Sequence, residues 1–125
     1  MDEQHKDLSL ADLIRRYRNG ERDFSWVELT DGESARGIDL SDAIFDHSWI
    51  DSVDFTGSTL RGSSFRDAHV KCCTFDEADL RESDFRGSCV DGASFISADL
   101  TGAQFAGATA YGAELKEGDL PPTEK

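Results

Sequence analysis

The residues of this chain that could do chemistry are few, and they do not form a familiar site. Cysteine and histidine suggest a metal or redox centre, because His69 and Cys89 lie twenty residues apart and Cys72 follows His69 closely. A metal site needs three or four converging ligands, and only these three can be assembled, without a characteristic spacing. We therefore expect no metal ion, and we expect Cys73 to behave as a small hydrophobic residue.

Catalytic motifs are missing from the sequence as well. It contains three histidines but no glycine-rich phosphate loop, nucleophile elbow or Walker-type sequence. Asp79 and Asp99 could act as an acid–base pair if the fold placed them side by side. Because both aspartates occupy the same position of a repeated unit, a structural role explains them better. The sequence predicts a protein that is not an enzyme and uses no cofactor.

A strict period of five and ten residues must position all of these side chains. Seven of the eight phenylalanines lie ten residues apart, from Phe45 to Phe105, and only Phe24 is out of phase. Large apolar residues fill every fifth position and form the predicted core, which consists of Leu40, Phe45, Ile50, Phe55, Leu60, Phe65, Val70, Phe75, Leu80, Phe85, Val90, Phe95, Leu100, Phe105 and Leu115.

Each unit of five residues predicts one side and one corner of a coil. The residue two positions before each large residue is mostly small, and side chains two apart on an extended segment point the same way. The other residues are polar or glycine, as a tight corner requires. Leucine recurs after twenty residues in the large position, which indicates four sides per coil. Phenylalanines ten apart then face each other across a square core.

This pattern resembles that of the pentapeptide-repeat proteins, whose unit is commonly written A-(D/N)-L-X-X. Residues 78–82 (Ala-Asp-Leu-Arg-Glu) and residues 98–102 (Ala-Asp-Leu-Thr-Gly) match the unit in full. The resemblance implies an all-β solenoid, a right-handed quadrilateral β-helix of about four to five coils, here expected over residues 23–120. Residues 121–125 are expected to form a polar tail.

The N-terminal segment, residues 1–22, breaks the period and predicts a capping helix over about residues 10–19. Ser9 is suited to cap the helix, and Asp12 has the spacing of a capping box. Because the first coil of a solenoid needs cover, we expect this helix to be its lid. The step from Leu29 to Leu40 is eleven residues instead of ten, which predicts a one-residue bulge within residues 30–36.

The chain is strongly acidic, with a formal net charge of −13. This charge disfavours direct binding to nucleic acids and to anionic membranes. One interpretation is a solubilising surface, since the outward residues of such a coil must be polar. The other is imitation of DNA, which the resemblance implies because some family members inhibit DNA gyrase. This chain lacks the length and the C-terminal helix of those relatives.

Residues that depart from the repeat form the candidate partner surface. Ile44 and Trp49 are large and apolar in outward positions, and Tyr111 lies at a corner near the end of the repeats. Ile44 and Trp49 could instead lie under the N-terminal helix or its loop. The remaining candidates are four arginines that are expected to stack in two pairs, Arg61 with Arg81 and Arg66 with Arg86. They either form a patch that binds a partner or make ion pairs with nearby acidic residues.

We therefore predict a scaffold that mediates protein–protein interaction with an unidentified protein partner. The alternatives are a DNA-mimicking gyrase inhibitor and, less well supported, a small-molecule binder or enzyme with a surface site. The chain is expected to be a monomer or a dimer through its C-terminal coil. Its acidic, polar start is unlike a secretory signal and it has no long apolar run, so the expected compartment is the cytoplasm, without membrane association.

Overall fold

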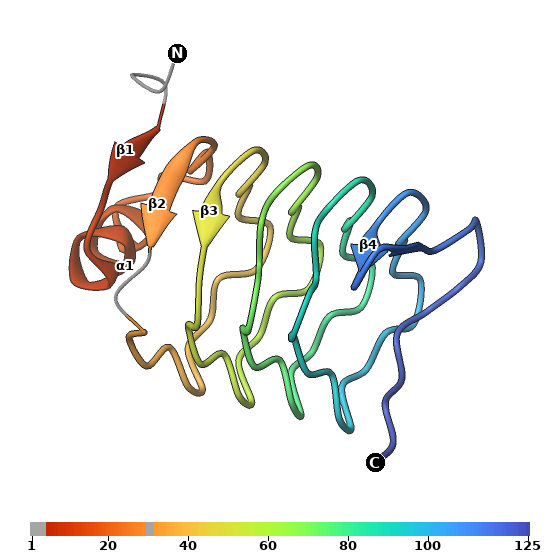
Figure 1. The fold of residues 1–125 in the computed structure, drawn as a ribbon. Helices are drawn as coiled ribbons and strands as arrows, with labels where there is room; N and C mark the ends of the chain where they lie inside the picture. Colours follow the sequence, from red (N-terminus) through yellow and green to blue (C-terminus); the bar gives the residue numbers. More distant parts are fainter. Residues whose placement is uncertain (1–4, 30–31) are drawn as a thin grey trace.

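The chain winds into a solenoid whose coils stack along one axis (Figure 1). The computed structural model describes residues 5–29 and 32–125. Most sides of the solenoid are too short to count as strands and are joined by single bridges. The elements in the described residues are β1 (Lys6–Asp7), α1 (Leu10–Arg18), β2 (Val27–Leu29), β3 (Trp49–Ile50), β4 (Thr109–Ala110) and β5 (Ala113–Glu114).

Parallel bridges join each coil to the next. From Ser34 onward, every isolated bridge among the described residues pairs two residues that are twenty apart, as Asp79 pairs with Asp99. The bridged residues recur at every fifth position, so these bridges form four ladders, one for each side of the coil. The predicted β-helix built from units of five residues is therefore confirmed.

Each corner is a tight turn with one residue in the left-handed region. After Leu40, for example, the amide of Ala43 donates to the carbonyl of Leu40 at 3.1 Å, and Asp42 has a φ of 63°. A positive φ at the third residue of a turn is the type II pattern, which glycine adopts without strain. Several corners carry a side chain there instead, among them Asp42, His47, Asp67, Cys72, Glu77 and Glu82.

We expect Glu77→Gly to stabilise the protein. Glu77 is exposed and has a φ of 61°, a conformation that costs a residue with a Cβ about 1 kcal/mol. Thermal denaturation should give a higher Tm for Glu77→Gly than for Glu77→Ala, which removes the same carboxylate but keeps the Cβ. Equal Tm values for the two variants would show that this corner is not strained.

Aspartates in the middle of the short sides stabilise the corners. The Asp54 carboxylate accepts hydrogen bonds from the amide and the hydroxyl of Thr56, at 2.9 and 2.5 Å. The same bond to the amide two residues later is made by Asp23, Asp39, Asp79, Asp84 and Asp99. These Asx turns explain why the repeat unit contains an aspartate.

The core is a stack of side chains along the solenoid axis. Phe65 and Phe85 lie in one column with ring centroids 4.7 Å apart, and Phe75 in the facing column meets Phe65 edge-on at 5.9 Å. Each of the large residues proposed for the core from Leu40 to Phe105 is at most 6% exposed. Leu115 is only partly buried, because the chain has already left the regular coil at that position.

The helix α1 lies at the N-terminal end of the solenoid (Figure 1). Ser9 caps it, since its hydroxyl accepts a hydrogen bond from the Asp12 amide at 3.1 Å. The Asp12 carboxylate pairs with Arg15 at 3.0 Å, so the capping box is not the interaction that engages it. Leu10 and Leu13 are buried in the core. No helix within the described residues is both long enough and apolar enough to cross a membrane.

The opening coil contains one residue more than the others. The strands β1, β2 and β3 form a parallel sheet in that order. Leu29 lies opposite Ile50, 21 residues later, whereas Ser34 lies opposite Asp54. The extra residue predicted within residues 30–36 is therefore inserted between Leu29 and Ser34, and Thr30 and Asp31 lie outside the described residues.

The C-terminal end departs from the regular repeat expected up to residue 120. After β4 the chain turns back, and β5 pairs with β4 in an antiparallel hairpin. The two loop residues, Tyr111 and Gly112, have φ values of 51° and 81°, the pattern of a type I′ hairpin turn. The tail then returns over the last coil, where the Ser97 amide donates to the Thr123 carbonyl at 2.8 Å.

Candidate functional site

Trp49, one of the candidate partner residues, is half-buried under the segment that precedes α1. The His5 ring stacks on the Trp49 indole, with centroids 3.8 Å apart and planes inclined by 26°. The Nε2 atom of His5 donates a hydrogen bond to the carbonyl of His47 at 3.0 Å. A residue ahead of the helix therefore covers this indole.

A cluster of histidine and tryptophan rings surrounds this contact. Trp26 stacks on His47 at 4.5 Å and meets His5 edge-on at 5.2 Å, while His69 and Trp49 form a T-shaped pair with centroids 6.4 Å apart. The cluster thus contains all three histidines and both tryptophans of the chain. The sequence did not predict it, because His5 lies outside the repeat and the extra residue shifts Trp26 out of phase with His47.

We expect iodide to quench the tryptophan fluorescence of the wild type weakly. His5→Ala should expose the Trp49 indole and increase the Stern–Volmer quenching constant. His69→Ala is the matched control, since it removes a more distant ring, 6.4 Å from Trp49, and leaves the His5 ring stacked on the indole. A wild type that is quenched as strongly as His5→Ala would contradict this arrangement.

Ile44 and the arginines are also largely engaged. Ile44 is half-buried and bridges Asp23 of the opening coil. Arg81 makes a bidentate contact with Asp79 at 2.8 and 2.7 Å, and Arg86 makes the same contact with Asp84 at 3.0 and 2.8 Å. Such solvent-exposed pairs contribute little to stability. Two of the four candidate arginines therefore form ion pairs with aspartates of the repeat.

The other two arginines are exposed. Arg66 lies 3.8 Å from the carboxylate of Asp84, a loose contact compared with that of Arg86. Arg61 lies one coil before Arg81 in the same column, and its charge adds to the Arg81 hydrogen bonds that lower the pKa of Asp79. Both cations remain accessible, but each is close to carboxylates of the same surface.

The aspartates that could have formed an acid–base pair are held in the ionised form. Hydrogen bonds from Arg81 lower the pKa of Asp79, and a hydrogen bond from the Thr101 hydroxyl lowers the pKa of Asp99. General acid–base catalysis near neutral pH instead needs a carboxyl whose pKa is raised. Asp79 and Asp99 pair in one ladder because they occupy the same position in successive coils, and each forms an Asx turn there.

Cys89 pairs with His69 in one ladder, but the cysteines and histidines of the described chain do not form a cluster of three ligands. Cys72 is exposed, Cys89 is half-buried, and burial raises the pKa of Cys73 to about 12, so its thiol is inert. Within residues 5–29 and 32–125, no three histidine, cysteine or acidic side chains are arranged to hold a metal ion.

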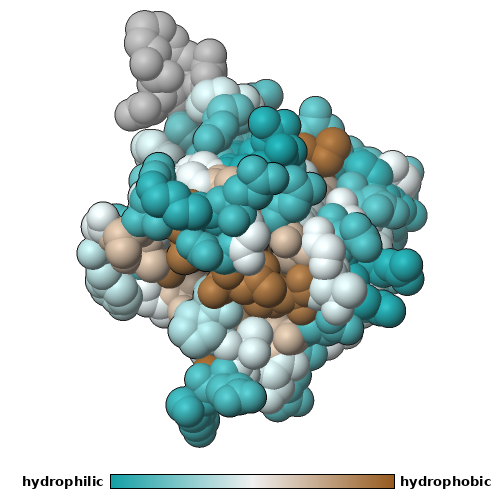
Figure 2. Space-filling view, turned by 90° about the vertical axis from the view of Figure 1, so that its right-hand side faces the viewer, coloured by the Kyte–Doolittle hydropathy of each residue, from teal (hydrophilic) through white to brown (hydrophobic). Residues whose placement is uncertain are grey.

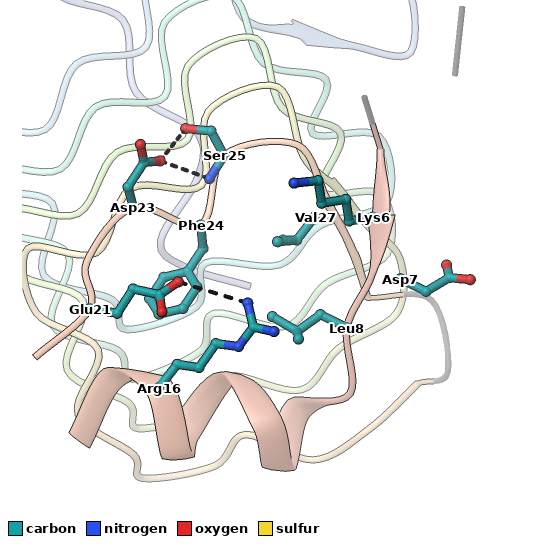
Figure 3. Close-up of a pocket in the computed structure, with 9 residues that line it drawn as sticks. All are labelled: Lys6, Asp7, Leu8, Arg16, Glu21, Asp23, Phe24, Ser25 and Val27. Atoms are coloured by element: carbon teal, nitrogen blue, oxygen red, sulfur yellow. Dashed lines mark hydrogen bonds and ion pairs between the residues drawn. The ribbon is translucent and has the colours of Figure 1, made fainter. Parts of the chain in front are cut away.

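A cavity of about 250 Å³ lies at the N-terminal end, between β1, α1 and the start of the opening coil (Figure 3). Phe24 and Val27 form its floor, but they are only 2% and 6% exposed. Arg16 crosses it toward Glu21, with the charged atoms 3.9 Å apart, and Asp7 points away (Figure 3). The cavity therefore offers a small, charge-balanced recess with little accessible apolar surface.

The C-terminal end is more open. The exposed large hydrophobic residues of the described chain are Tyr111, at 79%, and Leu120, at 48%. Figure 2 looks onto this end and shows apolar residues gathered in the middle of the face, surrounded by polar ones. A groove of about 400 Å³ lies there between the last leucine side and the tail, lined among others by Ala98, Leu100 and Leu120.

The backbone of the last coil is only partly covered. The hairpin bonds at residues 107–110, through Gly107 and Ala108, and the tail bonds at Ser97. Between these contacts, residues 98–105 make no backbone hydrogen bond to the hairpin or the tail within the described chain. This edge, together with Tyr111 and Leu120, is called the C-terminal end face below.

Two family models match the repeat region. Pentapeptide repeats in nine copies match residues 48–98, and pentapeptide repeats in eight copies match residues 88–121. No curated protein matches the sequence.

Solved structures resemble this fold. The chain is similar to the pentapeptide repeat protein Rfr23 from the cyanobacterium Cyanothece 51142, at 18% identity over 83% of this chain and 63% of that one, with a TM-score of 0.67. At this identity the likeness shows the fold alone. The chain is also similar to HetL from Nostoc sp. strain PCC 7120, a pentapeptide repeat protein involved in heterocyst differentiation regulation, at 27% identity over 81% and 46% of the two chains, with a TM-score of 0.48.

A third structure is the pentapeptide repeat protein alr5209 from Nostoc PCC 7120. It is 25% identical over 94% of this chain and 92% of that one, with a TM-score of 0.47. The chain therefore spans less than two thirds of the first two structures and nearly the whole of the third.

Proposed function

The chain belongs to the pentapeptide-repeat family, and we propose that it is a non-catalytic scaffold that binds a partner protein through its C-terminal end face. One observation carries the proposal: Leu120 is exposed beside an edge whose backbone has no partner within the described residues, at the end of the solenoid where Tyr111 is exposed as well. Exposed apolar residues at such an end mark sites of protein interaction. A solenoid offers such a surface on a rigid frame.

Most of the other candidate partner residues already make contacts within the protein, which favours the C-terminal end face as the binding site. Trp49 is covered by His5, and Ile44 is half-buried against the opening coil. Arg81 and Arg86 hold carboxylates of the repeat. Arg61 and Arg66 are exposed, but they lie on the flank of the solenoid and interrupt its acidic surface. Of these residues, Tyr111 is the one that combines a large apolar side chain with high exposure.

The two ends of the solenoid have different roles in this proposal. At the N-terminal end, α1 buries Leu10 and Leu13 against the core and acts as the lid of a β-helix of about four to five coils. At the other end, the hairpin and the tail leave part of the last coil open. Pro121 and Pro122 have no amide to donate, so the tail cannot extend the ladder there.

The test compares the full chain with the double variant Tyr111→Ser/Leu120→Ser. The immobilised wild type should retain from a native lysate a protein that the double variant loses, while the control Arg66→Ser on the flank retains it. Sedimentation velocity detects the case in which the partner is a second copy, because a dimer of the wild type should then be a monomer in the double variant. Identical capture and identical mass for both proteins would refute the proposal.

DNA mimicry is supported by the net charge of −13 alone. Arg61, Arg66, Arg81 and Arg86 form two cationic columns on the surface, which a surface imitating the phosphates of DNA would lack. We therefore expect no inhibition of DNA gyrase in a supercoiling assay at micromolar protein. Inhibition at such a concentration that Arg66→Glu strengthens would instead favour the mimic.

A further inference from the structure

The uncovered edge of the last coil has a specific hydrogen-bonding requirement. In the preceding coil, the amide of Leu80 donates to the Asp99 carbonyl at 2.9 Å, and the Asp99 amide donates to the Ala78 carbonyl at 3.0 Å. The middle residue of a short side thus makes both bonds to the side beneath it. The corresponding groups of the last leucine side are the Leu100 amide and the Ala98 carbonyl, which have no backbone partner within the described residues.

The next side of the coil is less accessible. The Phe105 amide and the Ala103 carbonyl are also without backbone partners in the described chain, but Phe105 is only 1% exposed, so its main chain is covered. The Gly102 amide, at the corner between the two sides, is without a backbone partner among the described residues as well, and Gly102 is exposed. The accessible edge therefore carries the Ala98 carbonyl and the amides of Leu100 and Gly102. Exposed strand edges of this kind pair readily with an extended segment of another chain.

The side chains beside this edge determine which side chains an incoming segment needs. Throughout the solenoid a small residue packs over a small one and a large apolar residue over a large one, as Ala98 follows Ala78 and Leu100 follows Leu80. Ala98 and Leu100 line the groove described above, and Leu120 forms its outer wall. A segment with a small residue, any residue and a large apolar residue would therefore fill the groove and continue the core.

Charge selects the middle residue. Asp99 is exposed in the middle of the open side, and Arg81 already approaches its carboxylate from the coil below, at 3.8 Å. An incoming middle side chain would lie over Asp99 in the same ladder. Because the protein carries a net charge of −13, a basic residue is favoured at this position and an acidic one is disfavoured.

We propose that the partner of the C-terminal end face is an extended basic segment with the pattern small–basic–large apolar, which adds to residues 98–102 as a further β-strand. This rests on the proposed function, since it specifies how the same face recognises a protein. The middle residue of the segment donates to the Ala98 carbonyl and accepts from the Leu100 amide.

The test uses the full-length protein and the peptide acetyl-Ala-Lys-Leu-Lys-Gly-amide. Its control is the same peptide with an N-methyl group on the amide of the first lysine, which keeps the charge and the side chains but removes the donor to Ala98. Hydrogen exchange followed by NMR should show the Leu100 amide protected by roughly tenfold with the first peptide. The control peptide should give no protection.

Two further variants of the protein separate strand addition from unspecific attraction to an acidic surface. Leu120→Asp should weaken binding by removing the groove wall, whereas Glu77→Gln on the flank, which removes one negative charge, should leave it unchanged. Binding of both peptides with equal affinity, or protection of other amides only, would overturn the proposal. So would protection of the Leu100 amide by self-association without peptide, because the occupant would then be a second copy.

The same data distinguish this proposal from the function on which it rests. If the peptide fails to bind but capture of a protein still depends on Tyr111 and Leu120, the end face is a partner site that works without strand addition. If capture is independent of both residues, the proposed function itself is wrong.

Discussion

Phe75→Ala is expected to lower the free energy of unfolding by about 3–5 kcal/mol. The Phe75 ring is fully buried, and it stacks between Phe55 and Phe95, with centroids 5.2 and 5.1 Å away. It also meets Phe65 and Phe85 edge-on, at 5.9 and 5.6 Å. Truncation therefore leaves a cavity that touches four aromatic rings in three successive coils.

The position of this cavity makes the effect large. Each coil of a solenoid contacts only its neighbours, so a weakened middle coil has no other part of the structure to support it. Urea denaturation followed by circular dichroism measures the change. Phe75→Leu, which keeps most of the volume, should cost less than about 1.5 kcal/mol, and Leu120→Ala at the exposed tail less than about 0.5 kcal/mol. A cost below about 1 kcal/mol for Phe75→Ala would contradict the stacked core.

Acidification is expected to unfold the protein between about pH 4 and pH 2. Hydrogen bonds from Ser25, Ser41 and Thr56 lower the pKa values of the aspartates two residues before them. The pKa values of Asp79 and Asp99 are lowered in the same way. At Asp84, burial alone would raise the pKa, but the hydrogen bonds and the charge of Arg86 outweigh it and the pKa is lowered.

The sign of the pH dependence follows from the direction of these shifts. A carboxyl whose pKa is lower in the folded state stabilises the fold when ionised, so the full contribution is present above the unfolded value of about 3.9. It is lost as the pH falls through the lower folded values. Each contribution is small because these groups are largely exposed to solvent, but the same Asx bond recurs along the solenoid.

The control separates this effect from general charge repulsion. The triple variant Asp39→Asn/Asp54→Asn/Asp99→Asn keeps the hydrogen-bond acceptor at three corners but removes its titration. In 0.3 M salt, which screens repulsion between cations, its urea midpoint should change less between pH 5 and pH 3 than that of the wild type. An equal loss in both proteins would show that the Asx bonds are not the source of the acid sensitivity.

The five-residue period was enough to predict the β-helix, its core positions and its corners. Every coil packs against an equivalent coil, so equivalent positions of successive coils need side chains of the same size and polarity. The sequence therefore repeats these side chains in each coil. This is why the residues from Phe45 to Phe105 could be assigned to the core from spacing alone. The family resemblance carried by residues 78–82 and 98–102 rests on the same repetition.

The candidate site was less predictable because its residues occur once. Trp49 was predicted to be an outward aromatic residue, either a partner site or covered by the N-terminal segment, and the ring that covers it belongs to His5, 44 residues earlier in the sequence. The end of the solenoid also depends on single features. Tyr111 and Gly112 fit the five-residue spacing, yet their consecutive left-handed conformations form a hairpin instead of another corner.

The sequence by itself thus determined the repeating frame of this protein, since periodic packing makes each unit evidence for the others. Only the tertiary structure decided what happens at the two ends. There the chain meets segments that are distant in sequence and not repeated, and backbone groups lack a following coil to bond with. The covered N-terminal end and the open edge at residues 98–102 therefore had to be seen in three dimensions, and the open edge is where the partner is proposed to bind.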